Sequence, residues 1–378
     1  MNLDHLNEKQ REAVLCTEGP LLILAGAGSG KTATMTHRIA YLIEQGVSPY
    51  KIMAVTFTNK AATEMRQRVE KLVGQVPGMW ILTFHSMSLR ILREHYEEVG
   101  YERNFVIYDT VDQKALYKNI LKDLNIDTKE YPINYLSAII SKEKEADRGP
   151  EEFIEREGMN FKTRTIYSVY KEYQERLRKN NAMDFDDLLR YALHVLRDNR
   201  EILMEYQRVF DYIMVDEYQD TNHIQYQIVK LLAKAKENIC VVGDDDQSIY
   251  KFRGATIENI LTFDRTYPNA KTVKLEQNYR STKTILDAAN AVISKNSERK
   301  GKELWCDGEK GDKIVLKKLQ NQLEEGRFIT DTISNIHEHD GEPYKNFAVL
   351  YRTNAMSRSV EQALAKSGIP YRILGGLR

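Results

Sequence analysis

Short unbroken apolar runs recur along the chain, and most of them end in polar or glycine-rich residues. Each run is too short for a buried helix and suits a central strand of a parallel sheet. The predicted strands cover residues 21–24, 52–57, 80–84, 212–215, 239–242 and 273–275. Because amphipathic helices alternate with these runs, we predict an α/β fold built on a parallel sheet.

A different pattern fills residues 88–181. Glycine is scarce there, and long charged amphipathic stretches predict helices at 113–124, 133–147 and 163–179. We therefore expect a helical subdomain inserted into a sheet domain made of residues 1–87 and 182–280. A basic run at its end, Arg176, Arg178 and Lys179, favours a solvated helix face over a nucleic-acid patch.

The α/β alternation restarts after residue 280. It predicts helices at 283–295, 323–336 and 355–366, a charged linker at 296–312, and strands at 314–319, 347–351 and 371–374. Residues 281–378 are thus expected to form a second, Rossmann-like domain without a phosphate-binding loop of its own.

The first predicted strand leads into the glycine-rich residues of LLILAGAGSGKT, and a helical pattern follows. Glycines let backbone N–H groups close around a phosphate, and a helix N-terminus adds a favourable dipole. Lys31 supplies charge for the phosphates and Thr32 a hydroxyl for Mg²⁺. The strict P-loop pattern has glycine where this chain has Ala25, and the alternative is a glycine-rich turn that binds nothing. The residues expected to bind phosphate are Ala27, Gly28, Ser29, Gly30, Lys31 and Thr32.

Acidic residues follow the strand at 212–215. Asp216 would hold Mg²⁺ through water, and Glu217 would orient or deprotonate the attacking water, as in a Walker B motif. After the strand at 239–242, Gln247 is placed to sense a γ-phosphate. Arg280 is a candidate arginine finger, with an ordinary surface salt bridge as the alternative.

Hydroxyl, amide and aromatic residues follow two further strands, in the segments TFTNK and TFHS. The carboxyl ends of parallel strands bind ligands, and this mixture suits single-stranded nucleic acid. The alternative is that Phe57 and Phe84 belong to the core. Further along, Tyr250 and Phe252 would face the same way on an extended segment, as a base-stacking platform would.

Composition limits the kind of nucleic-acid surface and the cellular compartment that we expect. Lys+Arg and Asp+Glu both number 55, so any nucleic-acid surface must be local. The widely separated cysteines, Cys16, Cys240 and Cys306, fit a reducing compartment. The polar N-terminus is not a signal peptide, and no apolar run approaches membrane-spanning length, so we expect a cytoplasmic protein.

Taken together, the separated motifs resemble those of superfamily 1A DNA helicases of the UvrD/Rep/PcrA family, over the whole chain. The matching segments are LNEKQ, AGAGSGKT, TFTNKAATEMRQR, TFHS, DFDDLL, VDEYQDTN, GDDDQSIYKFRGA, LEQNYRST and YRTNAMSR. This family commonly tolerates alanine at the position of Ala25. The resemblance implies two RecA-like subdomains, 1A and 2A, with the helical insertion as subdomain 1B.

The resemblance also implies roles at matching positions. Gln10 would read adenine, Arg38 and Tyr279 would hold the nucleotide, and Arg280 would be the finger brought in by subdomain 2A. Lys31 and Thr32 would bind phosphate and Mg²⁺, Asp216 would complete the metal site, Glu217 would be the catalytic base, and Gln247 would couple the γ-phosphate to DNA movement. The implied DNA contacts are Phe57, Thr58, Asn59, Lys60, Thr83, His85, Tyr250, Phe252, Arg253, Arg352 and Asn354.

Two departures from the family pattern matter. The position of Phe252 is usually tryptophan, so the stacking face is smaller. The family also continues well past Arg378, with further motifs and a second arginine at the γ-phosphate. We therefore expect an N-terminal portion that binds Mg·ATP and single strands weakly and turns over little.

The expected activity is an ATP-driven 3′-to-5′ motor on single-stranded DNA and ss/dsDNA junctions, acting in repair or replication with partner proteins. Three alternatives stay open: the motor part of a helicase–nuclease, a non-enzymatic module that binds a polymerase or repair factor, and a P-loop kinase. Gln247, Arg280 and the lack of an Arg-rich lid argue against the kinase. Stacking and phosphate contacts tolerate RNA as well as DNA.

Overall fold

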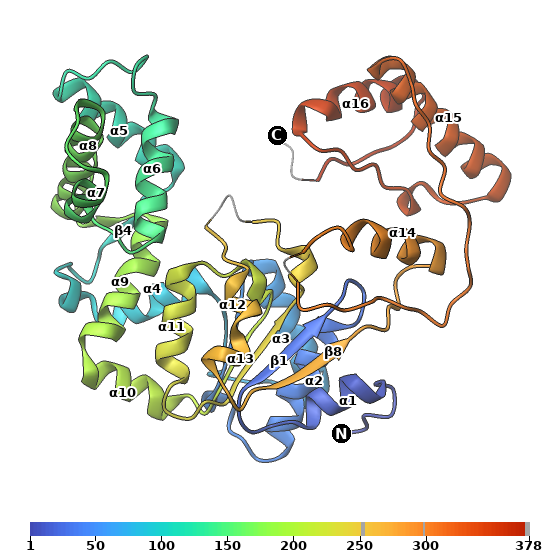
Figure 1. Cartoon of the computed structure of the whole chain (residues 1–378), viewed down its shortest axis with the longest axis horizontal. Coiled ribbons are helices and arrows are strands. Elements are labelled where there is room, and N and C mark those ends of the chain that lie inside the picture. Colours follow the sequence, from blue (N-terminus) through green and yellow to red (C-terminus); the bar gives the residue numbers. More distant parts are fainter. Residues whose placement is uncertain (251–253, 298, 375–378) are drawn as a thin grey trace. The chain divides into compact units, whose positions relative to one another are not determined.

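The computed structural model describes residues 1–250, 254–297 and 299–374. The chain divides into two compact units, Met1–Gly311 and Asp312–Arg378 (Figure 1). No helix in the described part of the chain is both long and apolar enough to cross a membrane.

A six-stranded parallel sheet forms the centre of the first unit, with the strand order β3-β2-β6-β7-β1-β8. The strands are β1 (Leu21–Ala25), β2 (Ile52–Thr56), β3 (Trp80–Thr83), β6 (Tyr212–Val215), β7 (Ile239–Gly243) and β8 (Lys271–Leu275). Every strand predicted for this domain is confirmed. Because all pairings are parallel, the polar segments after the strands meet at one edge of the sheet.

Helices cover both faces of this sheet, and alternate residues of β1 enter different cores. Leu22 and Leu24 pack with α4, α9 and α11, whereas Leu21 and Ile23 pack with α1, α2 and α3. Burial on both faces explains why the strand reads as a continuous apolar run. The helices are α1 (Glu8–Leu15), α2 (Lys31–Glu44), α3 (Asn59–Val73), α4 (Phe84–Glu94), α9 (Phe185–Asp198), α10 (Arg200–Val209), α11 (His223–Ala233), α12 (Glu258–Leu261) and α13 (Phe263–Thr266).

The predicted helical insertion is confirmed and has its own hydrophobic core, in which the rings of Tyr117 and Tyr173 stack 4.3 Å apart. Its elements are α5 (Thr110–Asp123), α6 (Ile133–Glu145), α7 (Pro150–Glu157), α8 (Phe161–Lys179) and the paired strands β4 (Val106–Ile107) and β5 (Ala182–Met183). The expected boundary at residue 88 lies inside α4, whose Met87 and Ile91 belong to the core of the sheet domain. Arg176, from the basic run, pairs with acidic side chains of the insertion.

The chain after β8 stays with the first unit through α14 (Lys283–Ile293) and up to Gly311. The backbone N–H of Asn278 donates to the carbonyl of Trp305 at 2.7 Å, and Trp305 donates to Glu276 at 3.1 Å. The expected domain boundary at residue 280 therefore does not separate compact units, because these hydrogen bonds fold residues 299–305 back onto the end of β8.

The second unit contains α15 (Gln322–Asp340) and α16 (Ser357–Lys366), which bury Ile333, Val360 and Leu364. The strands predicted at 314–319, 347–351 and 371–374 are wrong for the residues that the structure describes, since none has strand pairing. A strand needs a hydrogen-bonded neighbour, and these segments have none among the described residues. Phe347 and Val349 pack against the small core of this unit, whereas other apolar side chains of these segments stay in solvent: Leu316 is 95% exposed and Leu350 93%.

Candidate active site

The predicted strand–loop–helix at the phosphate loop (residues 25–32) is confirmed. β1 ends at Ala25, and α2 begins at Lys31 with Gly30 as its N-cap at φ +83°. A Cβ atom on Gly30 would lie 2.6 Å from Gln10 Nε2, so a side chain there would strain the left-handed backbone and displace the Gln10 amide. The free N–H groups at the start of α2 make this helix end suitable for a phosphate.

Neighbouring residues brace the phosphate loop. The Gln10 amide donates to the carbonyl of Ser29 at 2.9 Å, and Ser29 Oγ donates to Gly26 at 2.7 Å. From the other side, Asn278 Nδ2 donates to the carbonyl of Ala27 at 2.5 Å, and Tyr279 N–H to that of Gly28 at 3.0 Å. Gln10 also completes the capping box of α1 with Asn7, so it joins α1 to the loop; its contact with adenine stays a prediction.

Arg38 is bonded to the end of α1, and its predicted contact with the nucleotide stays a prediction. Its side chain is buried, and its guanidinium donates to the carbonyls of Ala13, Cys16 and Thr17 at the end of α1. A helix C-terminus leaves carbonyls without partners and favours a cation, so Arg38 holds α1 onto α2.

Tyr279 and Arg280 are both accessible to solvent. The Tyr279 ring is 59% exposed, and its hydroxyl accepts from Asn7 Nδ2 at 2.8 Å. Arg280 is exposed, and its guanidinium forms no ion pair with any residue in the described part of the chain. The surface salt bridge considered for Arg280 is therefore not seen there.

The two acidic residues after β6 have different surroundings. Asp216 is buried, and burial together with the nearby Glu217 charge raises its pKa to about 6. Glu217 Oε2 lies 3.5 Å from Lys31 Nζ. The backbone of Glu217 is left-handed at φ +49°, a strained conformation that costs about 1–3 kcal/mol and is typical of functional sites.

The side chains at this position fit a bound magnesium ion. Thr32 and Asp216 line the same cavity, and the buried Asp220 Oδ1 has no hydrogen-bond partner among the described residues. A carboxylate and a hydroxyl are hard oxygen donors of the kind that Mg²⁺ prefers. A cation would also offset the negative charge that raises the pKa of Asp216.

Two residues to which the sequence analysis gave no role, Gln219 and Asp244, are bonded to the predicted site residues. Gln219 Nε2 donates to Glu217 Oε2 at 2.9 Å, and its carbonyl oxygen accepts from Asp244 N–H at 2.9 Å. Asp244 in turn accepts from Gln247 Nε2 and lies 3.9 Å from Lys31 Nζ. Their only sequence signal is that each follows a buried strand within a polar run.

A cavity of about 580 Å³ brings several predicted nucleic-acid contacts next to the acidic residues. Phe57, Thr58, His85 and Tyr250 line it together with Thr32, Asp216, Glu217 and Gln247. The ring of Phe57 contacts the edge of Phe84 at 5.5 Å, and Phe84 itself is buried. The core interpretation is therefore correct for Phe84, whereas Phe57 faces the cavity. Burial lowers the pKa of His85, which favours a neutral ring.

The remaining predicted DNA contacts are less uniform. Thr58 and Thr83 cap helices α3 and α4, and Thr83 is buried in that role. Asn59 and Lys60 are exposed at the start of α3. Arg352 and Asn354 are exposed on the second unit, and Phe252 and Arg253 lie outside the described residues.

Comparisons with known proteins agree with this geometry. Residues 6–268 match the family model for the UvrD/REP helicase N-terminal domain, and residues 273–378 match the UvrD-like helicase C-terminal domain. The chain is 50% identical over 376 residues to the ATP-dependent DNA helicase PcrA of Staphylococcus aureus (strain NCTC 8325), covering 99% of this chain and 51% of that protein. It is 51% identical over 374 residues to PcrA of Staphylococcus epidermidis (strain ATCC 12228), covering 98% of this chain and 51% of the relative. The chain thus spans about half the length of these relatives. By these matches, the chain belongs to the UvrD/REP helicase family.

Proposed function

We propose that this chain forms the ATP-hydrolysing and strand-binding part of a DNA helicase. One observation carries the proposal: a single cavity is lined by Thr32, Asp216 and Glu217 and also by Phe57 and Tyr250. Hydrolysis in one part of that cavity would move groups that contact nucleic acid in the other. The names of the relatives, which describe an ATP-dependent DNA helicase, support the same reading.

The residues of the site divide the work of hydrolysis between them. The N–H groups at the start of α2 and Lys31 bind the phosphates, while Tyr279 stacks on the base. Glu217 takes the proton of the attacking water, and Arg280 stabilises the charge that develops on the transferred phosphate. Mg²⁺, when bound by Thr32 and Asp216, would shield the phosphate charge.

The link to nucleic acid runs through the segment after β7. Gln247 and Glu217 both line the cavity, and Tyr250, three positions after Gln247, lines it as well. The aromatic rings of Phe57 and Tyr250 in its lining favour stacking of bases. We therefore propose binding of single-stranded DNA, with 3′-to-5′ translocation and action at junctions in repair or replication as what the family resemblance implies.

The test measures phosphate release from ATP by the full 378-residue chain, with and without a single-stranded oligonucleotide. Glu217→Gln is expected to abolish hydrolysis while Mg·ATP affinity stays within about twofold, because the lost group acts on the water. Lys31→Ala is expected to weaken Mg·ATP binding at least about tenfold, because it removes a charge from the phosphates. Glu201→Gln, an exposed position on α10, is the matched control.

Single-stranded DNA should raise the hydrolysis rate, and the Phe57→Ala change should reduce that stimulation more than the basal rate. Unchanged hydrolysis in Glu217→Gln would refute the catalytic assignment. Hydrolysis that responds to no nucleic acid would refute the helicase proposal and leave a simple nucleotide hydrolase.

A further inference from the structure

A buried lysine stands among the acidic residues that follow β7. Lys302 Nζ lies 2.6 Å from Asp244 Oδ1 and 2.8 Å from Asp246 Oδ2, and it also pairs with Asp245. Its side chain is 1% exposed. These carboxylates are close enough together to hold a metal ion, but the Lys302 ammonium already pairs with all of them.

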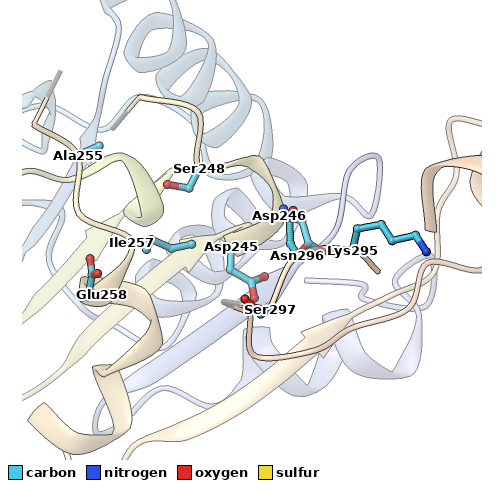
Figure 2. A pocket seen from close by; sticks show the side chains of 9 residues that line it. All are labelled: Asp245, Asp246, Ser248, Ala255, Ile257, Glu258, Lys295, Asn296 and Ser297. Atoms are coloured by element: carbon cyan, nitrogen blue, oxygen red, sulfur yellow. The ribbon is translucent and has the colours of Figure 1, made fainter. Parts of the chain in front are cut away.

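Two neighbours of Lys302 bind the same acidic residues. Arg299 pairs with Asp246 at 2.8 Å, and the backbone N–H of Lys300 donates to Asp245 Oδ2 at 2.7 Å. We call Arg299, Lys300 and Lys302 the basic clamp. Figure 2 shows Asp245 and Asp246 beside the chain segment that precedes the clamp, where Asn296 and Ser297 share a cavity wall with them.

Asp244, one of the acidic residues paired with Lys302, is hydrogen-bonded to residues of the candidate active site. Asp244 accepts a hydrogen bond from Gln247, and its N–H binds Gln219, which in turn binds Glu217. Asp244 Oδ2 also lies 3.9 Å from Lys31 Nζ. A short hydrogen-bonded path therefore runs from Lys302 to Asp244. From Asp244 it continues to Gln247 and, through Gln219, to Glu217.

Without Lys302, Lys31 would be the closest cation to Asp244. The carboxylates left without Lys302 would attract Lys31 away from a nucleotide. Their mutual repulsion would also shift Asp244, to which Gln247 is hydrogen-bonded. With Lys302 present, the acids have their own counter-charge, so Lys31 is left for the phosphates.

We propose that Lys302 is a positioning residue for ATP hydrolysis, which fixes Asp244 and thereby Gln247 through the buried ion cluster. This proposal rests on the proposed function for its kinetic consequence. The structural consequence, an ordered segment 244–247 that depends on Lys302, stands separately and can be measured without nucleotide.

The experiment compares the full chain with Lys302→Met, Lys302→Arg and Lys310→Met. Lys310 is the matched control, because it is exposed in the same segment and forms no ion pair with the described residues. In Lys302→Met, kcat for ATP is expected to fall at least about tenfold while the Kd for Mg·ATP changes less than about threefold. Lys302→Arg keeps the charge and should restore kcat to within about threefold of the original chain.

A kcat for Lys302→Met equal to that of Lys310→Met would overturn the proposal, as would a Lys302→Arg variant as slow as Lys302→Met. Hydrogen exchange provides the second readout. Amides at 244–247, where Asp246 N–H donates to Asp244 at 3.2 Å, should exchange several-fold faster in Lys302→Met without nucleotide. Unchanged exchange would refute the proposal that Lys302 orders residues 244–247, whatever the ATPase activity. A lack of ATPase activity in the unsubstituted chain would contradict only the proposed function.

If Lys302→Met does not fold, the double variant Lys302→Met/Asp245→Asn replaces it. Removing one carboxylate reduces the repulsion that the lost ammonium leaves behind, so this variant should fold. It should still show the faster exchange and the lower kcat, because Asp244 lacks its partner. Original values of both quantities in the double variant would refute a role for Lys302.

Discussion

Replacing Lys144 with alanine should destabilise the protein strongly, because this lysine is the counter-charge of a fully buried cluster. Lys144 Nζ on α6 lies 2.6 Å from Asp184 Oδ2 and 2.9 Å from Asp187 Oδ1, and its side chain is 0% exposed. Asp184 is also the N-cap of α9. The cluster thus joins the helical insertion to the helix that leads back into the sheet domain.

The expected magnitude follows from the burial of all partners. Breaking a buried pair by removing one member costs about 3–5 kcal/mol, because the remaining charges stay in a medium that solvates them poorly. A loss of that size lowers the melting temperature of a domain this large by at least about 5 °C. The Lys144 ammonium also faces the ring of Tyr173 at 4.9 Å, which adds to the loss.

The stability lost in the Lys144→Ala variant should depend on pH in a defined direction. Burial and the Asp184 charge raise the pKa of Asp187 to about 6. Burial also acts to raise the pKa of Asp184, but the Lys144 charge and the hydrogen bonds that Asp184 accepts together outweigh it and lower that pKa. Without Lys144, both carboxyl groups have raised pKa values in the folded state. The folded variant then binds more protons than the unfolded chain, so its stability falls as pH rises through those values. The deficit should be larger at pH 8 than at pH 5.

Thermal and urea denaturation, followed by circular dichroism at both pH values, measure this effect. Lys142→Ala, an exposed lysine on the same helix, serves as the control. A Lys144→Ala variant within about 1 kcal/mol of the control at pH 8, or a deficit that grows toward pH 5, would refute the reasoning.

Two other predictions concern the sheet domain. Gly30→Ala should weaken Mg·ATP binding and lower the free energy of unfolding by about 1–2 kcal/mol, because the left-handed backbone and the nearby Gln10 amide disfavour a Cβ atom. Fluorescence titration measures the binding, and unchanged binding would contradict this prediction. Burial raises the pKa of Cys240 to about 11, so in native protein at pH 8 iodoacetamide should modify Cys16 and Cys306 well before Cys240, as followed by mass spectrometry; equal rates would contradict the burial.

The sheet domain could be predicted from sequence because its local signals agree with its tertiary structure. The runs that form β1 and β7 are buried on both faces, so every residue of them is apolar and the pattern is unambiguous. The residues after each strand could be assigned to one edge, since parallel pairing places all carboxyl ends together. The phosphate loop and the acidic residues of the candidate site could be predicted from the glycines, from Lys31 and from the Asp216-Glu217 pair.

The second unit shows where this reasoning fails. The β-branched and other apolar residues of segments 314–319 and 347–351 favour strands, whereas strand formation depends on a neighbour that offers hydrogen bonds. The roles of Gln219, Asp244 and Lys302 were also out of reach. The bond between Gln219 and Asp244 and the pairing of Asp244 with Lys302 join segments that lie far apart along the chain, and no local periodicity records which buried polar groups will meet. Arg38 was assigned to the nucleotide through the family resemblance alone, and its bonds to the end of α1 could not be predicted from local sequence either.

The strand order has a consequence for how this chain assembles during synthesis. β1, which carries the phosphate loop, is the first strand made, yet it lies between β7 and β8, the last two strands of the sheet. Leu21 cannot gain its backbone partners until Cys240 and Lys271 have left the ribosome. The helical insertion, which has its own core, is complete before then. Closing such a long loop is slow and entropically costly, so the nucleotide-binding element is among the first segments translated and among the last to be held in place.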